Sequence, residues 1–147
     1  MAYEHTQTSY VALVVLDVVV TVTILAFVLG GSPAQPIVVA VVAFSVIAAI
    51  VYGFSRLTVR VDPAAVTASF AWGWPRKVIP TDEIVSVRAV RNRWYHGWGV
   101  RKVARGWMYN VWGLDAVELE RRSGKVFRIG TDQPVELAAV IAAATES

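Results

Sequence analysis

Two long stretches near the start of the chain are predominantly apolar. Residues 10–29 contain one ionisable side chain, Asp17, and residues 37–54 contain none. As helices rising about 1.5 Å per residue they would be about 30 and 27 Å long, close to the roughly 30 Å hydrocarbon core of a bilayer. Both are predicted to be transmembrane helices, because a helix satisfies its own backbone hydrogen bonds in lipid.

The segment between these stretches, residues 30–36, holds two Gly and two Pro, which predict a short loop and hence a helical hairpin. A cleavable signal peptide is the alternative for the first stretch, since Ser32 and Ala34 are small and suitably spaced for cleavage. The preceding tail, residues 1–9, has no Lys or Arg, and a twenty-residue apolar run exceeds the roughly 7–15 residues typical of such signals. We therefore expect the segment to be retained.

The pattern changes after Ser55, where Leu57, Val59 and Val61 alternate with polar residues as in a half-buried strand. Turn residues separate further strands of this kind. The expected strands are 57–61, 66–72, 77–79, 84–91, 100–104, 107–112, 116–120 and 126–129. Pro134 then begins an amphipathic helix. The prediction is an α+β membrane protein, in which a transmembrane hairpin precedes an antiparallel β-barrel or sandwich of about seven strands, capped by a C-terminal helix, over residues 56–147.

Charge is divided between the two regions. Of the 147 residues, 56% are apolar and 17% charged, and all 14 Lys and Arg follow residue 55. Residues 1–55 hold two of the 11 acids, so the two regions carry net charges of −2 and +5. Arg56 and Arg60 follow the second helix, whereas residues 30–36 have no base, so the positive-inside rule predicts both termini on the cytoplasmic side of the plasma membrane.

The inventory for catalysis is small. The chain has no Cys and two His, which excludes disulfides and thiolate chemistry. His96 has no second His near it in the predicted β domain, so no metal site is expected. The close carboxylate pairs read as turn or surface residues. We therefore expect no enzyme, cofactor or metal.

A basic segment rich in Trp is the strongest candidate for binding. Residues 84–114 contain six Lys or Arg, four Trp and no acid. This composition suits contact with anionic lipid headgroups, an acidic peptide or a phosphate-bearing ligand, whereas tethering to a bilayer makes nucleic acid a poor candidate. The alternative is an ordinary sheet with Arg outward and Trp in the core. The predicted contact residues are Arg88, Arg91, Arg93, Trp94, Trp98, Arg101, Lys102 and Arg105.

Four residues of the helices are candidates for helix packing. Asp17 lies near the middle of the first helix, where it acts either as a packing contact, bonded to a hydroxyl such as that of Thr21, or as a proton or ion relay. Ser45, Ala49 and Gly53 form a stripe of small residues, which predicts either the hairpin seam or an oligomer interface.

Three local patterns carry a resemblance to a known family: residues 95–101 (YHGWGVR), 106–111 (GWMYNV) and 129–134 (IGTDQP). With strands followed by one helix, the chain resembles small bacterial membrane proteins that carry a pleckstrin-homology-like (PH-like) domain behind a two-helix hairpin. The resemblance implies an architecture and no catalytic residues. Lipid-binding PH domains place Lys and Arg between their first two strands, whereas residues 62–65 hold neither, so the resemblance does not extend to that phosphoinositide site.

The expected function is a membrane-anchored binding or assembly module that engages anionic lipid or a protein partner. The alternatives are an accessory subunit that docks a larger complex through its helices, and a transporter or channel protomer that uses Asp17.

Overall fold

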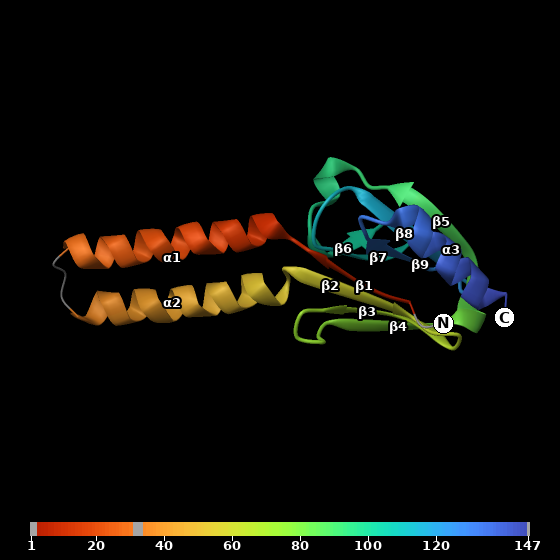
Figure 1. The fold of residues 1–147 in the computed structure, drawn as a ribbon, viewed down its shortest axis with the longest axis horizontal. Helices are drawn as coiled ribbons and strands as arrows, with labels where there is room; N and C mark the ends of the chain where they lie inside the picture. Colours follow the sequence, from red (N-terminus) through yellow and green to blue (C-terminus); the bar gives the residue numbers. More distant parts are fainter. Residues whose placement is uncertain (1–2, 31–33, 147) are drawn as a thin grey trace.

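The computed structural model describes residues 3–30 and 34–146 of the chain. It consists of two long helices that project from a β domain, and the domain ends in a third helix (Figure 1). The class is α+β, as predicted.

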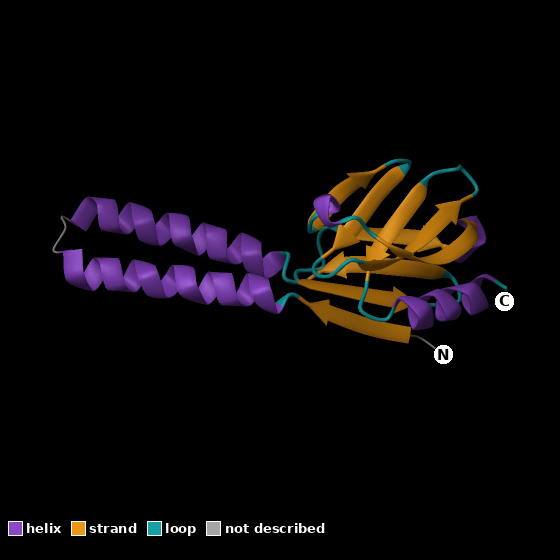
Figure 2. Cartoon of the chain, turned by 90° about the horizontal axis from the view of Figure 1, so that it is seen from above, coloured by secondary structure: helices purple, strands orange, loops and turns teal. Residues whose placement is uncertain are grey.

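The long helices are α1, Tyr10–Gly30, and α2, Ala34–Gly53, which lie side by side (Figures 1 and 2). They agree with the predicted bounds to within about three residues, although residues 31–33 of the predicted loop lie outside the described part. By length and composition, α1 is able to cross a membrane, a criterion that an N-terminal signal sequence also meets. None of its apolar span is buried inside the structure, which distinguishes it from the core helix of a soluble domain.

The first sheet contains four antiparallel strands in the order β1-β2-β3-β4. Their bounds are β1 Tyr3–Thr8, β2 Arg56–Val61, β3 Ala65–Phe70 and β4 Arg76–Pro80. Strand β1 corrects the prediction of a tail over residues 1–9. It pairs with β2 from Tyr3 opposite Val61 to Thr8 opposite Arg56, so the β domain includes residues on both sides of the helix pair.

The second sheet contains five strands in the order β5-β8-β9-β7-β6. Their bounds are β5 Ile84–Arg91, β6 Gly99–Val103, β7 Gly106–Asn110, β8 Asp115–Arg121 and β9 Val126–Gly130. Single-turn helices at Thr81–Glu83 and Trp94–His96 flank β5.

One pairing in the second sheet differs from the predicted antiparallel arrangement. Strand β9 lies between β8 and β7. It runs antiparallel to β8 and parallel to β7. The backbones approach closely at Gly106, where a Cβ atom would lie 1.6 Å from the carbonyl oxygen of Val126. Gly106 is therefore required by packing.

The core lies between the two sheets and beneath helix α3, Pro134–Thr145. Alternate residues of β2 and β3 meet those of β8 and β9, and Leu137 and Ile141 of α3 complete the core. The apolar residues whose alternation predicted these strands are thus the residues whose side chains fill the core. Helix α3 contacts β5, β8 and β2, and so spans both sheets.

Candidate functional site at the helix-facing end of the β domain

The two long helices join the β domain at one of its ends, and several of the predicted contact residues lie at that end. Strand β1 runs into α1 and α2 runs into β2, and the backbone N–H of Ser9 donates to the carbonyl of Ser55 across this junction at 2.7 Å. The end of the domain that carries this junction is called the helix-facing end below. It contains parts of the β3–β4 turn, the segment between β5 and β6, and the start of β6.

The β3–β4 turn places two tryptophans at this end. The N–H of Ala71 donates to the carbonyl of Gly53, the last residue of α2, at 3.2 Å. The ring of Trp72 lies against Gly53, so a Cβ atom there would lie 3.5 Å from it. Trp74 follows in the same turn and is 76% exposed.

The segment before β6 and the segment after β7 bring three more tryptophans together. Trp98 stacks on Trp112 with ring centroids 5.3 Å apart, and the carbonyl of Trp112 accepts a hydrogen bond from the Gln7 side chain of β1 at 3.2 Å. Trp94 lies beside them at a cavity of about 400 Å³ and is 82% exposed. We call Trp72, Trp74, Trp94, Trp98 and Trp112 the tryptophan rim. In membrane proteins, Trp and Tyr are enriched at the interface between bilayer and water.

Three of the predicted basic residues pair with acids of β8. Arg88 contacts Glu118 at 2.6 Å, Arg91 contacts Asp115 at 3.4 Å and Arg105 contacts Glu120 at 3.4 Å. Residues 84–114 contain no acid, but in the folded domain the acids of β8 lie close to three of their arginines. Pairing reduces the charge that these three arginines can offer to a ligand.

The other three predicted bases have no acidic partner among the described residues. Arg93 donates to the hydroxyl of Tyr95 at 3.0 Å, and the Arg101 Nε donates to the carbonyl of Trp98 at 2.8 Å. Lys102 is exposed on β6. We call Arg93, Arg101 and Lys102 the unpaired bases. Arg93 and Arg101 adjoin the tryptophan rim through pockets that they line with Trp94 and Trp98.

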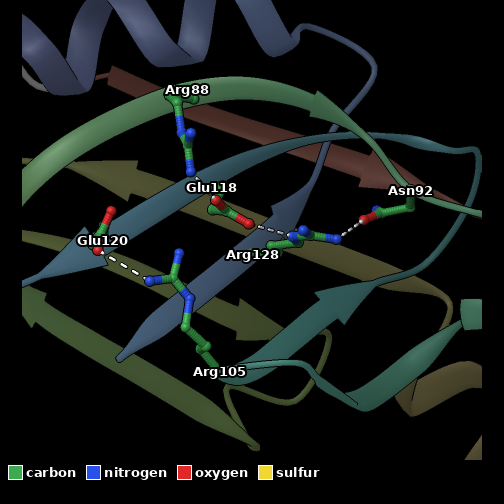
Figure 3. Close-up of polar contacts among 6 residues, drawn as sticks. All are labelled: Arg88, Asn92, Arg105, Glu118, Glu120 and Arg128. Carbon is green, nitrogen blue, oxygen red and sulfur yellow. Dashed lines mark hydrogen bonds and ion pairs between the residues drawn. The ribbon is translucent and has the colours of Figure 1, made fainter. Parts of the chain in front are cut away.

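The outer face of the second sheet holds a buried ion network (Figure 3). The Glu118 side chain is 7% exposed and accepts from the Arg88 Nη2 at 2.6 Å and the Arg128 Nε at 2.7 Å. Arg128 also donates to Asn92 at 3.1 Å. Burial opposes ionisation of Glu118, but the hydrogen bonds from Arg128 and Arg88 outweigh it, so the pKa of this carboxyl is lowered. The network joins β5, β8 and β9 and is structural.

A second polar connection ties β1 to the segment before α3. The Tyr3 hydroxyl donates to Gln133 at 3.1 Å, and the His5 Nε2 lies 2.6 Å from a carboxylate oxygen of Asp132. Burial, followed by the charges of Glu136 and Asp132, raises the pKa of Tyr3. Strand β1 thus joins the first sheet to the start of α3.

The candidate packing residues of the helices have different surroundings. Asp17 is exposed on α1, and its carboxyl has no hydrogen-bond or ionic partner within the described residues, Thr21 included. Ser45 is exposed and its hydroxyl donates to the carbonyl of Val41 at 2.8 Å. Ala49 is half-buried and Gly53 is buried against Trp72. The stripe therefore does not form one continuous seam, and a role at an oligomer interface stays a prediction.

The described residues contain no group of three or more His, Asp or Glu side chains that could hold a metal ion. His96 lies in the turn before β6, and its Nδ1 is buried with no hydrogen-bond partner in the described part of the chain.

Sequence reasoning had missed Trp72, Trp74 and β1 as parts of this end. The positions of the two tryptophans in the Trp-Gly-Trp-Pro turn at residues 72–75 were visible, but nothing local placed that turn against Gly53. The chain matches no family model, no curated protein and no solved structure, so its function has to be argued from this end of the β domain.

Proposed function

We propose that the protein is an integral membrane protein whose two helices anchor a cytoplasmic β domain, and that the helix-facing end of this domain binds anionic lipid headgroups. In this proposal α1 and α2 both cross the plasma membrane. The pairing of β1 with β2 supports it, because the strand before α1 and the strand after α2 must lie on the same side of the membrane. Arg56 and Arg60 favour the cytoplasmic side.

The same pairing argues for retention of α1. Cleavage after the first helix would remove β1, whose six residues all pair with β2. It would also remove the hydrogen bonds of Tyr3 and Gln7 to residues of the second half of the chain. Since such a loss would leave β2 as a bare sheet edge, a retained helix suits the fold better than a signal peptide.

The observation that carries the binding proposal is that exposed tryptophans and two bases without acidic partners, Arg93 and Arg101, occur at the same end of the domain, with Lys102 further along β6. Trp favours the interfacial zone, and each Lys or Arg near an anionic leaflet contributes about 1 kcal/mol. Arg93 and Arg101 would then contribute about 2 kcal/mol, enough for about a thirtyfold preference for anionic over neutral surfaces.

The test uses the full chain reconstituted in phosphatidylcholine nanodiscs with and without phosphatidylglycerol, with tryptophan quenching by brominated lipids of each kind. We expect stronger quenching by brominated phosphatidylglycerol, and loss of this preference when Arg93, Arg101 and Lys102 are changed to Gln. The control changes Arg105, Arg122 and Lys125 to Gln, in the two turns at the opposite end of the second sheet. Equal effects of the two triple variants would refute the proposal.

The side of the membrane is tested separately. The chain has no Cys, so a single Glu146→Cys substitution can be labelled cleanly. In intact cells a membrane-impermeant maleimide should leave it unlabelled until the membrane is opened.

We further infer that the β domain is PH-like. Two packed sheets with a C-terminal helix support this assignment. The parallel pairing of β7 with β9 and the added strand β1 depart from it.

Docking to a larger membrane complex is a second candidate function, favoured by Asp17. A carboxyl near the middle of a transmembrane helix costs about 2.5–3.5 kcal/mol on insertion scales, and this one is exposed and has no partner among the described residues. A polar group on a neighbouring subunit would remove this cost. Asp17→Leu should then abolish co-purification of that subunit in mild detergent; if Asp17 instead serves a proton pathway, Asp17→Asn should abolish flux in vesicles.

A further inference from the structure

A crevice separates the base of the helix pair from the second sheet. Its volume of about 520 Å³ lies within the range of roughly 300–1,000 Å³ common for small-molecule sites. Three elements form its walls: the first turns of α1, the last turns of α2 and the beginning of β6. The lining residues from the helices are Val11, Ala12, Val15, Ile50, Val51 and Phe54.

The lining is apolar apart from two residues, Ser9 and Arg101. Both backbone and side chain of Ser9 are engaged, since its N–H donates to Ser55 and its hydroxyl accepts from the N–H of Ala12 at 3.4 Å. Arg101 is therefore the one charged group on the described lining.

The guanidinium of Arg101 is oriented yet still available. Its Nε donates to the carbonyl of Trp98 at 2.8 Å, which fixes one edge of the group. The two terminal nitrogens have no partner among the described residues. Their N–H groups form the planar fork that matches a phosphate or carboxylate.

We propose that this crevice binds one anionic phospholipid, with an acyl chain between the helix pair and β6 and its phosphate group on Arg101. The proposal rests on the proposed membrane location, which places this junction at the level of the headgroups. A membrane lipid suits it because the walls contributed by α1 and α2 are continuous with their exposed apolar surfaces, while the one charge lies on the β domain.

The charge decides which lipid is preferred. An acyl chain in the crevice is in surroundings no more apolar than the bilayer that it leaves. The acyl chain therefore fits the shape of the crevice but contributes little to the choice between one lipid and another. One favourable Arg contact corresponds to about a fivefold preference for a lipid of the same chains with net negative charge.

The experiment is native mass spectrometry of the full chain in detergent, titrated with phosphatidylglycerol or phosphatidylcholine of identical chains. The variants are Arg101→Gln, which removes the headgroup contact, and Val15→Trp, which fills the crevice. The matched control for Arg101→Gln is Lys125→Gln, at an exposed base in the β8–β9 turn. The matched control for Val15→Trp is Val14→Trp, at a residue that is 61% exposed and outside the crevice.

We expect one retained phosphatidylglycerol, bound about fivefold more tightly than phosphatidylcholine. Arg101→Gln should remove this preference without changing the affinity for phosphatidylcholine, whereas Val15→Trp should weaken both, and the controls should match the parent chain. Equal retention of both lipids by the parent chain, or equal effects of Arg101→Gln and Lys125→Gln, would overturn the proposal. If Val15→Trp fails to fold, the Arg101→Gln comparison decides alone.

The same preparations distinguish this failure from failure of the proposed function. Flotation of the reconstituted chain with phosphatidylcholine vesicles after alkaline extraction reports anchoring. Loss of flotation would refute the membrane location and the crevice proposal with it. Flotation without a lipid preference would refute the crevice proposal only.

Discussion

The ion network of Glu118 allows a quantitative prediction for the substitution Glu118→Gln. The side chain keeps its size but loses the charge that accepts hydrogen bonds from Arg88 and Arg128. A hydrogen bond to a charged group contributes about 1.5–3 kcal/mol, and the amide that replaces one carboxylate oxygen would point a donor at an arginine. Arg88 is 56% exposed, so solvent screening limits its share to below about 1 kcal/mol. The total predicted loss is about 2–4 kcal/mol in the free energy of unfolding.

The pH dependence gives this prediction a second readout. The pKa of Glu118 is lowered in the folded state, so the ionised carboxylate stabilises the fold at neutral pH. That contribution is fully present above the ordinary pKa of Glu, about 4.3, and is lost as the pH falls through the lowered folded value. The parent chain and Glu118→Gln should therefore converge in stability in acid.

The assay is urea unfolding in detergent micelles, followed by tryptophan fluorescence from neutral to acidic pH. The matched control is Glu120→Gln, since Glu120 contacts the exposed Arg105 at 3.4 Å and should contribute less than about 0.5 kcal/mol. A loss for Glu118→Gln no larger than that of the control, or a constant difference from the parent chain at every pH, would refute the reasoning.

Three further predictions concern the fold and the rim. The fragment 56–147 should aggregate in solution because it exposes the edge of β2, whereas a chain with residues 10–54 replaced by a short Gly-Ser linker should be monomeric by size-exclusion chromatography, since the ends of the helix pair meet at the junction. Gly106→Ala should cost more than about 3 kcal/mol, because the added Cβ would collide with the β9 backbone, whereas Gly113→Ala, with a φ of 76° and open space, should cost about 1–2 kcal/mol in the same unfolding assay. Trp98→Ala should remove the stack on Trp112 and lower stability by about 0.5–1.5 kcal/mol beyond the loss of buried area; an unchanged near-ultraviolet circular dichroism spectrum would contradict the stacked arrangement.

The elements that sequence reasoning could predict are those whose signal is local. Alternation from Leu57 to Val61 identifies a strand without knowledge of its partner, and the apolar length of residues 10–29 identifies a helix. Strand β1 carries a weak signal, because Tyr3 is its only large apolar residue. It is a strand because β2, about fifty positions later, accepts it as a partner, and pairing at that distance is not visible in a local window.

The candidate site shows the same limit. The sequence identified a basic segment rich in Trp, but the acids that pair with Arg88, Arg91 and Arg105 lie on β8, up to 30 positions away. Only the position of β8 within the folded second sheet distinguishes these paired arginines from Arg93 and Arg101. The contribution of the Trp72 turn depends likewise on its contact with the end of α2.

The continuity of β1 with α1 and of α2 with β2 has a consequence for biogenesis. In a chain anchored as we propose, β1 emerges from the ribosome before β2 and has no partner strand until both helices have been made. A chain that inserts only α1 would hold β1 and β2 on opposite faces of the bilayer, and the β2 edge would stay open to aggregation or proteolysis. Completion of the first sheet would therefore act as a folding checkpoint for correct insertion, passed only by molecules with an even number of crossings.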